Sequence, residues 1–453
     1  MSLSVKFSDR FVAERTYVFD VLLGEFLGLP YTIQLEAGLE GYIIELPNGR
    51  SLRIRDAFFG TLPDSTNYIA VTSLPKRATF ARDVPFAPEP DAVMLFGQGT
   101  IVEEGGDLVC DIDIVATLFF MLSRWEEAIG NGPLDTHGRW PAANAVAFQY
   151  SFLHRPIVNE YAETIWSMMV HLGVDQPRRP RHFELVPTHD IDVIHYRRIR
   201  RLGYAAIGAR SPTALKNAVR SLFSAENPFD TFDWLMDISE SVGVRSRFNL
   251  LGGGTSRTYD AGRYTLADER LRDIVRRILR RKHILGFHAS YSSHMDFTQW
   301  ASERLAIENT FGVTLTEGRH HYLRFRVPDT WCMWDDGGMA VDSTAGYADA
   351  EGFRCGTGDL FSTFDVRRRR TLRLKERPLI IMEGTLAAYR KLSAAAAQDL
   401  FRRYIDVAAR YKMPLTILFH NNSFDEVRWL GWKTTYQAIF DHISQRGTHS
   451  WAI

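Results

Sequence analysis

From residue 183 to the C-terminus, short apolar or β-branched segments alternate with longer stretches of helical periodicity. Seven apolar segments stand out, at residues 183–187, 246–251, 283–287, 313–317, 339–342, 378–382 and 414–419. Stretches with helical spacing separate several of them, at residues 232–242, 268–281, 298–311 and 394–411. Because alternating strands and helices favour a parallel sheet, and seven strands suit a barrel, this region predicts a seven-stranded (β/α) barrel.

The first 180 residues have a different pattern. Residues 15–27 have helix-like apolar spacing, and residues 42–46 and 51–55 are strand candidates joined by a hairpin turn at Asn48-Gly49. The pattern becomes mainly helical after residue 110. We therefore predict an α/β chain with a smaller α+β N-terminal region before the barrel. Its parts are a mixed α/β domain at 1–110, a helical connecting region at 111–180 and the barrel domain at 181–453.

Composition narrows the class of protein. The chain has 453 residues, 45% of them hydrophobic and 24% charged, which is typical of a soluble globular protein. Its 54 basic residues balance its 54 acidic ones, so charge gives no reason to expect nucleic acid. The three cysteines form no CxxC pair, which argues against a disulfide framework or a thiolate zinc site. Without a membrane span or an apolar N-terminal signal, we expect a cytoplasmic protein.

Polar residues of the kinds that hydrolases use follow most of the predicted strands. In chain order they are Asp190, Asp192, His288, Arg319, His321, Asp342, Glu383 and His420. Active residues gather at the carboxyl ends of the strands in such barrels, so we expect these side chains to share one mouth. Asp342 and Glu383 are either orienting residues or strand caps.

This set of residues predicts a divalent metal site, with zinc as the favoured ion. A catalytic zinc needs about three protein ligands and one open position. Asp192 and His288 are the first two predicted ligands, and His294 is the third. His294 follows His288 by six residues, a spacing that requires a loop rather than a helix. The alternative for His294 is a solvated position at the start of a helix.

The remaining residues predict acid–base chemistry. Asp190 would accept a proton from the attacking water, and His420 would donate one to the leaving amine. Arg319 would orient Asp190, and a main-chain N–H near Tyr322 would bind the developing oxyanion. The simpler alternative is that Asp190 and Asp192 cap the following helix.

The C-terminal domain resembles the polysaccharide deacetylases of carbohydrate esterase family 4, which are related to nodulation-type chitooligosaccharide deacetylases. The family motif TFDDG is similar to residues 188–192, THDID, and the Leu-x-His motif matches residues 418–420, LFH. The resemblance implies a distorted barrel of about seven strands. It also implies a divalent metal held by one Asp and two His, and the removal of acetyl groups from glycans.

Two motifs of that family are altered here. In His-Ser/Thr-x-x-His, His288 matches the first histidine, but Ser292 stands at the position of the second and His294 is a displaced substitute. In Arg-x-Pro-Tyr, His321 replaces the proline, between Arg319 and Tyr322. His321 is therefore a rival third ligand, because the change in the second motif removes a metal ligand directly.

The whole chain also resembles a bacterial subgroup with an uncharacterised N-terminal domain. The similar segments are residues 122–127, 135–139, 155–160, 286–291 and 352–357. Tyr291 lies in one of them, and Arg354 in another that could cover the site; both are predicted to contact substrate, together with Tyr322. Trp429 is a candidate for stacking on a sugar ring.

The sequence therefore predicts a metal-dependent deacetylase that acts on a glycan or sugar precursor in bacterial envelope or exported polysaccharide synthesis. One alternative is a catalytically silent glycan-binding or assembly protein that keeps the barrel without full metal binding. Another is an amidohydrolase acting on a small substrate that is not a glycan.

Overall fold

The computed structural model describes residues 2–63, 67–196, 212–223, 226–256, 258–260 and 264–446. The chain forms two compact units. Unit 1 comprises residues 1–181, 326–335 and 352–378, and unit 2 comprises residues 182–325, 336–351 and 379–453. Two segments predicted inside the barrel domain thus belong to unit 1. The three-part division of the chain at 110 and 180 stays a prediction.

Unit 1 contains a six-stranded sheet in the order β2-β1-β3-β4-β8-β7. Its strands are β1 (Leu3–Phe7), β2 (Tyr31–Leu35), β3 (Tyr42–Glu45), β4 (Ser51–Ile54), β7 (Gly97–Glu104) and β8 (Asp107–Ile112). The predicted hairpin is confirmed, because β3 and β4 pair antiparallel and Gly49 between them has a φ of +85°. Two further antiparallel pairs are β5 (Thr79–Arg82) with β6 (Asp91–Met94), and β14 (Phe361–Asp365) with β15 (Arg370–Glu376).

The helices of unit 1 follow the apolar periodicity of the sequence. They are α1 (Val12–Phe19), which continues as a π-helix at Asp20–Leu27, α2 (Ile114–Ser123), α3 (Trp125–Ile129), α4 (Val146–Gln149), α5 (Ile157–His171) and α11 (Asp329–Asp336), which ends at the unit boundary. Every residue of α2 is buried, as expected for a helix that is apolar on all sides.

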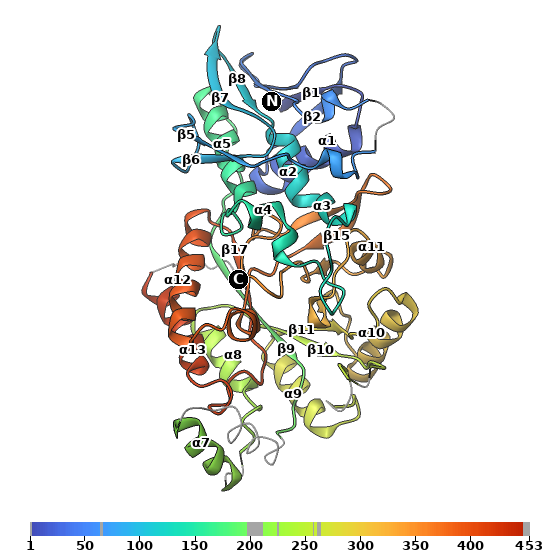
Figure 1. The fold of residues 1–453 in the computed structure, drawn as a ribbon, viewed down its shortest axis with the longest axis vertical. Coiled ribbons are helices and arrows are strands. Elements are labelled where there is room, and N and C mark those ends of the chain that lie inside the picture. The colour runs from blue at the N-terminus through green and yellow to red at the C-terminus, as the bar shows by residue number, and fades with distance from the viewer. Residues whose placement is uncertain are drawn as a thin grey trace. The chain divides into compact units, whose positions relative to one another are not determined.

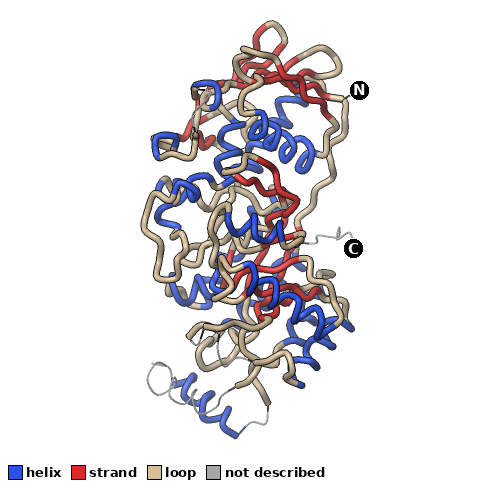
Figure 2. The backbone as a smooth tube through the Cα atoms, turned by 90° about the vertical axis from the view of Figure 1, so that its right-hand side faces the viewer, coloured by secondary structure: helices blue, strands red, loops and turns tan. Residues whose placement is uncertain are grey.

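Unit 2 contains seven strands in the order β13-β12-β11-β10-β9-β17-β16. They are β9 (Glu184–Ile191), β10 (Arg247–Leu251), β11 (Ile284–Ala289), β12 (Glu317–His320), β13 (Val341–Asp342), β16 (Ile381–Met382) and β17 (Pro414–Leu418). Each neighbouring pair is parallel, and the strands are red in Figure 2. The predicted α/β class with a parallel sheet is confirmed. Among the described strands no pairing joins β13 to β16, so a closed seven-stranded barrel is not shown.

All but the last of the helices of unit 2 lie between its strands in sequence, and the last one follows β17. They are α7 (Pro212–Phe223), α8 (Phe232–Ser241), α9 (Glu269–Arg280), α10 (Phe297–Phe311), α12 (Ala394–Arg410) and α13 (Trp432–Gln445). Helices α8, α12 and α13 lie next to one another, and α9 and α10 pack on β11 (Figure 1). Among the described residues, no helix combines the length and the apolar character that a membrane crossing requires.

One predicted strand is misplaced. The apolar segment at residues 313–317 predicted the fourth strand, but β12 begins where that segment ends, at Glu317. Its sequence, Glu-Gly-Arg-His, is polar, yet all four residues are buried. Glu317 forms an ion pair with Arg247 at 2.9 Å, and Arg319 donates to Thr188 at 2.9 Å. Buried ion pairs and hydrogen bonds therefore support a strand that hydrophobicity alone does not reveal.

Glycine at position 318 is required for β11 and β12 to lie together. A Cβ there would overlap the carbonyl oxygen of Phe287 and lie 2.8 Å from its carbonyl carbon, both of them main-chain atoms. We predict that Gly318→Ala lowers the free energy of unfolding by about 2–3 kcal/mol, because neither strand can yield without breaking the pairing. Urea unfolding followed by circular dichroism measures this change.

The control for Gly318→Ala is Gly253→Ala. The nearest atom to a Cβ at Gly253 is Cγ of the Glu303 side chain, at 3.6 Å, an ordinary contact. The control should change the free energy of unfolding by less than about 1 kcal/mol. Equal effects of the two substitutions would show that the approach of β11 to β12 does not limit stability.

Candidate metal centre

Strand register brings the polar residues of β9, β11 and β12 to one edge of the sheet. Asn249 of β10 pairs with Asp190 of β9, and His288 of β11 pairs with Arg319 of β12. These positions lie near the carboxyl ends of their strands. Asp192 and His321 come directly after β9 and β12. The structure thus brings the predicted residues Asp190, Asp192, His288, Arg319 and His321 to the same edge of the sheet.

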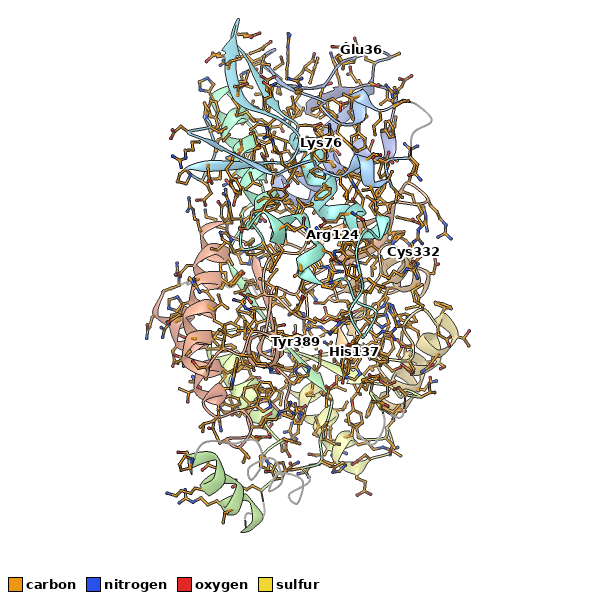
Figure 3. The ribbon with its side chains drawn as sticks, viewed as in Figure 1. Glu36, Lys76, Arg124, His137, Cys332 and Tyr389 are labelled. Atoms are coloured by element: carbon orange, nitrogen blue, oxygen red, sulfur yellow. The ribbon has the colours of Figure 1, made fainter. Side chains whose placement is uncertain are left out.

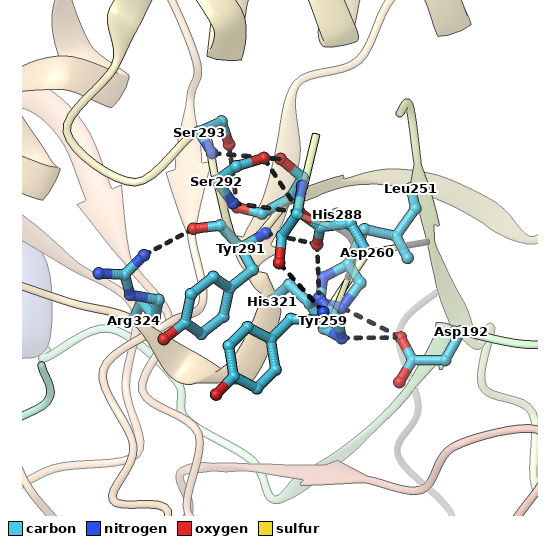
Figure 4. A network of polar contacts seen from close by, with 12 residues as sticks. Asp192, Leu251, Tyr259, Asp260, His288, Tyr291, Ser292, Ser293, His321 and Arg324 are labelled. Atoms are coloured by element: carbon cyan, nitrogen blue, oxygen red, sulfur yellow. Dashed lines mark hydrogen bonds and ion pairs between the residues drawn. The ribbon is translucent and has the colours of Figure 1, made fainter. Parts of the chain in front are cut away.

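Three of these side chains converge closely enough to share one ion. One ligand atom each of Asp192, His288 and His321 lies within 4.8 Å of the other two. Nε2 of His288 and Nε2 of His321 each lie 3.5 Å from Oδ1 of Asp192 (Figure 4). Two imidazole nitrogens and one carboxylate match the donor types of catalytic zinc sites.

The ring orientations also fit a metal. Nδ1 of His288 donates to the carbonyl oxygen of Arg319 at 3.1 Å, and Nδ1 of His321 faces Oδ1 of Asp260 at 3.3 Å. Both acceptors fix the proton on Nδ1, so the Nε2 lone pairs point toward Asp192. Nε2 of His288 is buried without a hydrogen bond among the described residues, which is costly unless a cation is bound there.

His294 lies outside this group of three. It sits in the turn before α10, with its ring 5.6 Å from the ring of His320 and perpendicular to it. The chain between His288 and His294 is held elsewhere, since Ser290 and Ser292 bond to Glu303 and Asp260. Of the two candidates for third ligand, the structure brings His321, and not His294, to Asp192 and His288.

Asp190 lies beside this group as a buried carboxylate. Its Oδ1 accepts a hydrogen bond from the Asn249 amide at 2.8 Å, and its Oδ2 lies 3.7 Å from Nε2 of His288. Burial raises the pKa of Asp190, but His288, Arg319 and His420 outweigh that effect and leave the pKa below its usual range. Asp190 is therefore charged at neutral pH and able to accept a proton.

Arg319 reaches Asp190 less directly than predicted. Its Nε lies 3.8 Å from Oδ1 of Asp190, while its Nη2 donates to the hydroxyls of Thr188 and Ser343. The direct hydrogen bond to Asp190 comes from Asn249, which the sequence reading missed. The available signal was an amide in the otherwise apolar run of β10.

His420 forms a close pair with Glu383. Nδ1 of His420 donates to Oε1 of Glu383 at 2.6 Å, and Ser423 donates to the same oxygen at 2.6 Å. Nε2 of His420 lies 3.9 Å from Oδ2 of Asp192. Burial lowers the pKa of His420, but the negative charges of Glu383, Asp192 and Asp190 have the larger effect and raise the pKa to about 10. Glu383 thus orients His420 and keeps it protonated.

Asp342 is buried further along the same edge, at the end of β13. Its Oδ1 accepts hydrogen bonds from the amide and the hydroxyl of Thr344. Burial raises the pKa of Asp342 to about 7, against the hydrogen bonds from Thr344 and Ser343 and the charge of Arg319. Asp342 therefore helps to fix the end of the strand next to Arg319.

The predicted substrate contacts have different surroundings. Tyr322 follows His321 with a φ of 62°, and the ring of Tyr291 stacks on that of Tyr259 with centroids 4.2 Å apart. Both tyrosines thus lie next to the candidate metal ligands. Trp429 lies in the turn before α13, with its ring 5.7 Å from that of Trp432.

Arg354 belongs to unit 1 and is buried there. Its Nε donates to Oε1 of Glu127 at 2.9 Å, and Glu127 also accepts from Arg124 at 3.0 Å. Figure 3 labels Arg124. Arg354 was predicted to lie in a segment that could cover the site and to contact substrate; in the structure its guanidinium group pairs with Glu127 inside unit 1.

Comparisons with known proteins give one family match and several distant structural similarities. Residues 3–173 match the model of a family of unknown function, DUF7033. No curated protein matches the chain.

Three solved structures show a distant similarity. A proposed polysaccharide deacetylase from Mycobacterium smegmatis is 16% identical with a TM-score of 0.39, and the alignment covers 61% of this chain and 87% of that one. A family 4 carbohydrate esterase from Streptomyces lividans, in complex with acetate, is 10% identical with a TM-score of 0.30. The alignment covers 59% of this chain and 91% of the esterase. A polysaccharide deacetylase from Bacillus cereus is 12% identical with a TM-score of 0.27. The alignment covers 59% of this chain and 89% of the Bacillus cereus protein.

The Glu383–His420 pair should stabilise the fold in a pH-dependent way. The pKa of His420 in the folded chain, about 10, exceeds the value of about 6.5 of an unperturbed histidine. Stability from a raised pKa is complete below about pH 6.5 and is lost as the pH rises through about 10. We predict that Glu383→Gln lowers the free energy of unfolding more at pH 6 than at pH 10.

Urea unfolding at the two pH values, with a chelator present, measures this difference. Glu269→Gln is the control, because Glu269 is exposed in the first turn of α9. Its small effect should be the same at both pH values. An effect of Glu383→Gln that does not change between pH 6 and pH 10 would contradict the prediction.

Proposed function

We propose that unit 2 is a metal-dependent hydrolase that removes an N-acetyl group from a glycan or a glycan precursor. The observation that carries this proposal is the convergence of Asp192, His288 and His321 beside a charged Asp190. Zinc is the proposed ion, because two histidines and one carboxylate form a common set of ligands for catalytic zinc. Held by Asp192, His288 and His321, the ion would supply polarisation of the substrate carbonyl and activation of a water molecule as nucleophile.

Asp190 and His420 divide the proton transfers between them. Asp190 accepts a proton from the attacking water as the oxygen of that water bonds to the acetyl carbon. His420 donates its proton to the amide nitrogen as the C–N bond breaks, so that acetate and a free amine leave. The lowered pKa of Asp190 and the raised pKa of His420 support this division, because one group is charged and the other protonated at neutral pH.

The surroundings of these two groups support their roles. The Asn249 amide holds Oδ1 of Asp190, which leaves Oδ2 on the side of His288. Glu383 accepts from Nδ1 of His420, so its Nε2 proton is the one available for transfer. The main-chain N–H of Tyr322 is the proposed donor to the carbonyl oxygen as negative charge develops on it.

The glycan part of the proposal rests on the aromatic side chains beside the ligands. Tyr259, Tyr291 and Tyr322 form a cluster with ring centroids between 4.2 and 5.4 Å apart. All three residues are partly exposed. Aromatic rings that combine an apolar face with a hydroxyl suit sugar rings, which present both C–H and O–H groups.

Metal content tests the ligand assignment. We predict about one zinc per wild-type chain after loading and dialysis, and almost none in Asp192→Ala or His321→Ala. His294→Ala should keep its zinc, because His294 lies against His320 instead. Inductively coupled plasma mass spectrometry measures all four. Loss of zinc in His294→Ala with retention in His321→Ala would reverse the assignment, and a wild type without zinc would favour a silent glycan-binding protein.

Acetate release from N-acetylated chitooligosaccharides tests the catalytic roles. Asp190→Asn should lower kcat by about 10²- to 10⁴-fold, the usual contribution of a general base, while zinc stays bound. Asp273→Asn is the matched control, because Asp273 is an exposed residue of α9. Activity of Asp190→Asn equal to that of the control would exclude Asp190 as the base.

A further inference from the structure

Asp260 is a buried carboxylate in the loop that follows β10. Its side chain is 0% exposed. Its oxygens accept hydrogen bonds from the main-chain N–H groups of Tyr291 at 2.9 Å, Ser292 at 3.2 Å and Ser256 at 3.3 Å. Oδ1 of Asp260 also faces Nδ1 of His321 at 3.3 Å (Figure 4). One carboxylate thus connects the loops after three neighbouring strands, β10, β11 and β12.

The loop around Asp260 is built for this close approach. Gly254 has a φ of +124°, and a Cβ there would lie 2.5 Å from Cβ and 2.6 Å from Cγ of Asp260. Any other residue at position 254 would displace the carboxylate. The side chain therefore has little freedom, which is what a residue that orients another requires.

Ser292 supports Asp260 from the opposite side. Its hydroxyl donates to Oδ2 of Asp260 at 3.0 Å, and it accepts from Nε2 of Gln299 at 2.7 Å and the amide of Thr255 at 2.9 Å. Position 292 is where the His-x-x-x-His spacing from His288 would put a second histidine. The serine found there does not reach the ligand group, but it is fixed to the residue that faces His321.

We infer that Asp260 is a positioning residue that holds His321 as the third metal ligand, in place of a histidine at position 292. This inference rests on the proposed function, because it requires His321 to bind the ion. The Asp260 carboxylate accepts the Nδ1 proton of His321, which leaves the lone pair on Nε2 directed at Asp192. Without Asp260, the ring would rotate or carry its proton on Nε2, and the ligand atom would be lost.

Zinc affinity of the full chain, measured by competition with a chromogenic chelator, tests the inference. Loss of a carboxylate that orients a ligating histidine typically weakens metal binding by about 10- to 100-fold. We expect a value near the lower end for Asp260→Asn, which can still accept a hydrogen bond, and near the upper end for Asp260→Ala. Asp296→Asn is the matched control, because Asp296 is an exposed cap of α10, and its affinity should equal that of the wild type.

A second measurement separates orientation from general loosening of the fold. ¹⁵N NMR of the histidine rings in zinc-free protein reports which nitrogen of His321 carries the proton. The wild type and Asp296→Asn should show the proton on Nδ1, and Asp260→Ala should move it to Nε2. Because Asp260→Asn keeps the shape of the side chain, it remains informative if Asp260→Ala does not fold.

The outcomes distinguish the inference from the proposed function. Zinc affinity in both Asp260 variants equal to that of the wild type would overturn the inference and leave the proposed function standing. A wild type that binds no zinc would overturn both. Weaker zinc binding in the Asp260 variants, a changed His321 tautomer and an unaffected Asp296→Asn would establish the positioning role.

Discussion

The candidate site depends on neutralising two carboxylates at the end of one buried strand. Asp190 lies near the end of β9 and Asp192 directly follows the strand, and their side chains are 3% and 14% exposed. Two negative charges this close in a region of low dielectric repel each other and lose their hydration, so each needs positive or hydrogen-bonding partners. The Asn249 amide, Arg319 and the protonated His420 meet that need, and they lie around the two carboxylates.

The partners of Asp190 and Asp192 serve different chemical roles. Asn249 and the more distant Arg319 hold Asp190 as a charged carboxylate. Asp192 faces two imidazole nitrogens whose protons are fixed on the opposite side of each ring. One carboxylate is thereby prepared to accept a proton and the other to bind a cation, although only one residue separates them in sequence.

Part of this arrangement could be predicted from the sequence, because apolar strand segments alternate regularly with stretches of helical periodicity in the second half of the chain. The apolar segments locate β9, β10, β11 and β17 to within a few residues. Polar residues that follow these segments can be recognised in the sequence because they differ from the apolar residues before them. The prediction misplaced β12, since its buried residues are charged and paired by contacts that only the folded chain makes.

The residues that sequence reasoning missed act through loops or across strands. Asp260 lies in an irregular loop where one more aspartate carries no periodic signal, and its importance comes from three loops meeting around it. Asn249 is recognisable only once the register between β9 and β10 is known. His321 was weighed against His294 because sequence spacing cannot say which loop folds back toward β9.

The adjacency of β11 and β12 explains how a ligand can come from either strand. His288 of β11 lies opposite Arg319 of β12 in the parallel register. His321, which follows β12, therefore lies at the same edge of the sheet as the loop that follows β11. The loops after the two strands therefore leave the sheet at the same edge, and His321 reaches Asp192 from the second of them. A histidine four residues after His288 would belong to the same short loop, whereas His321 needs a partner from outside its own loop. The sheet thus fixes where a ligand can be placed, and the loops decide which residue provides it.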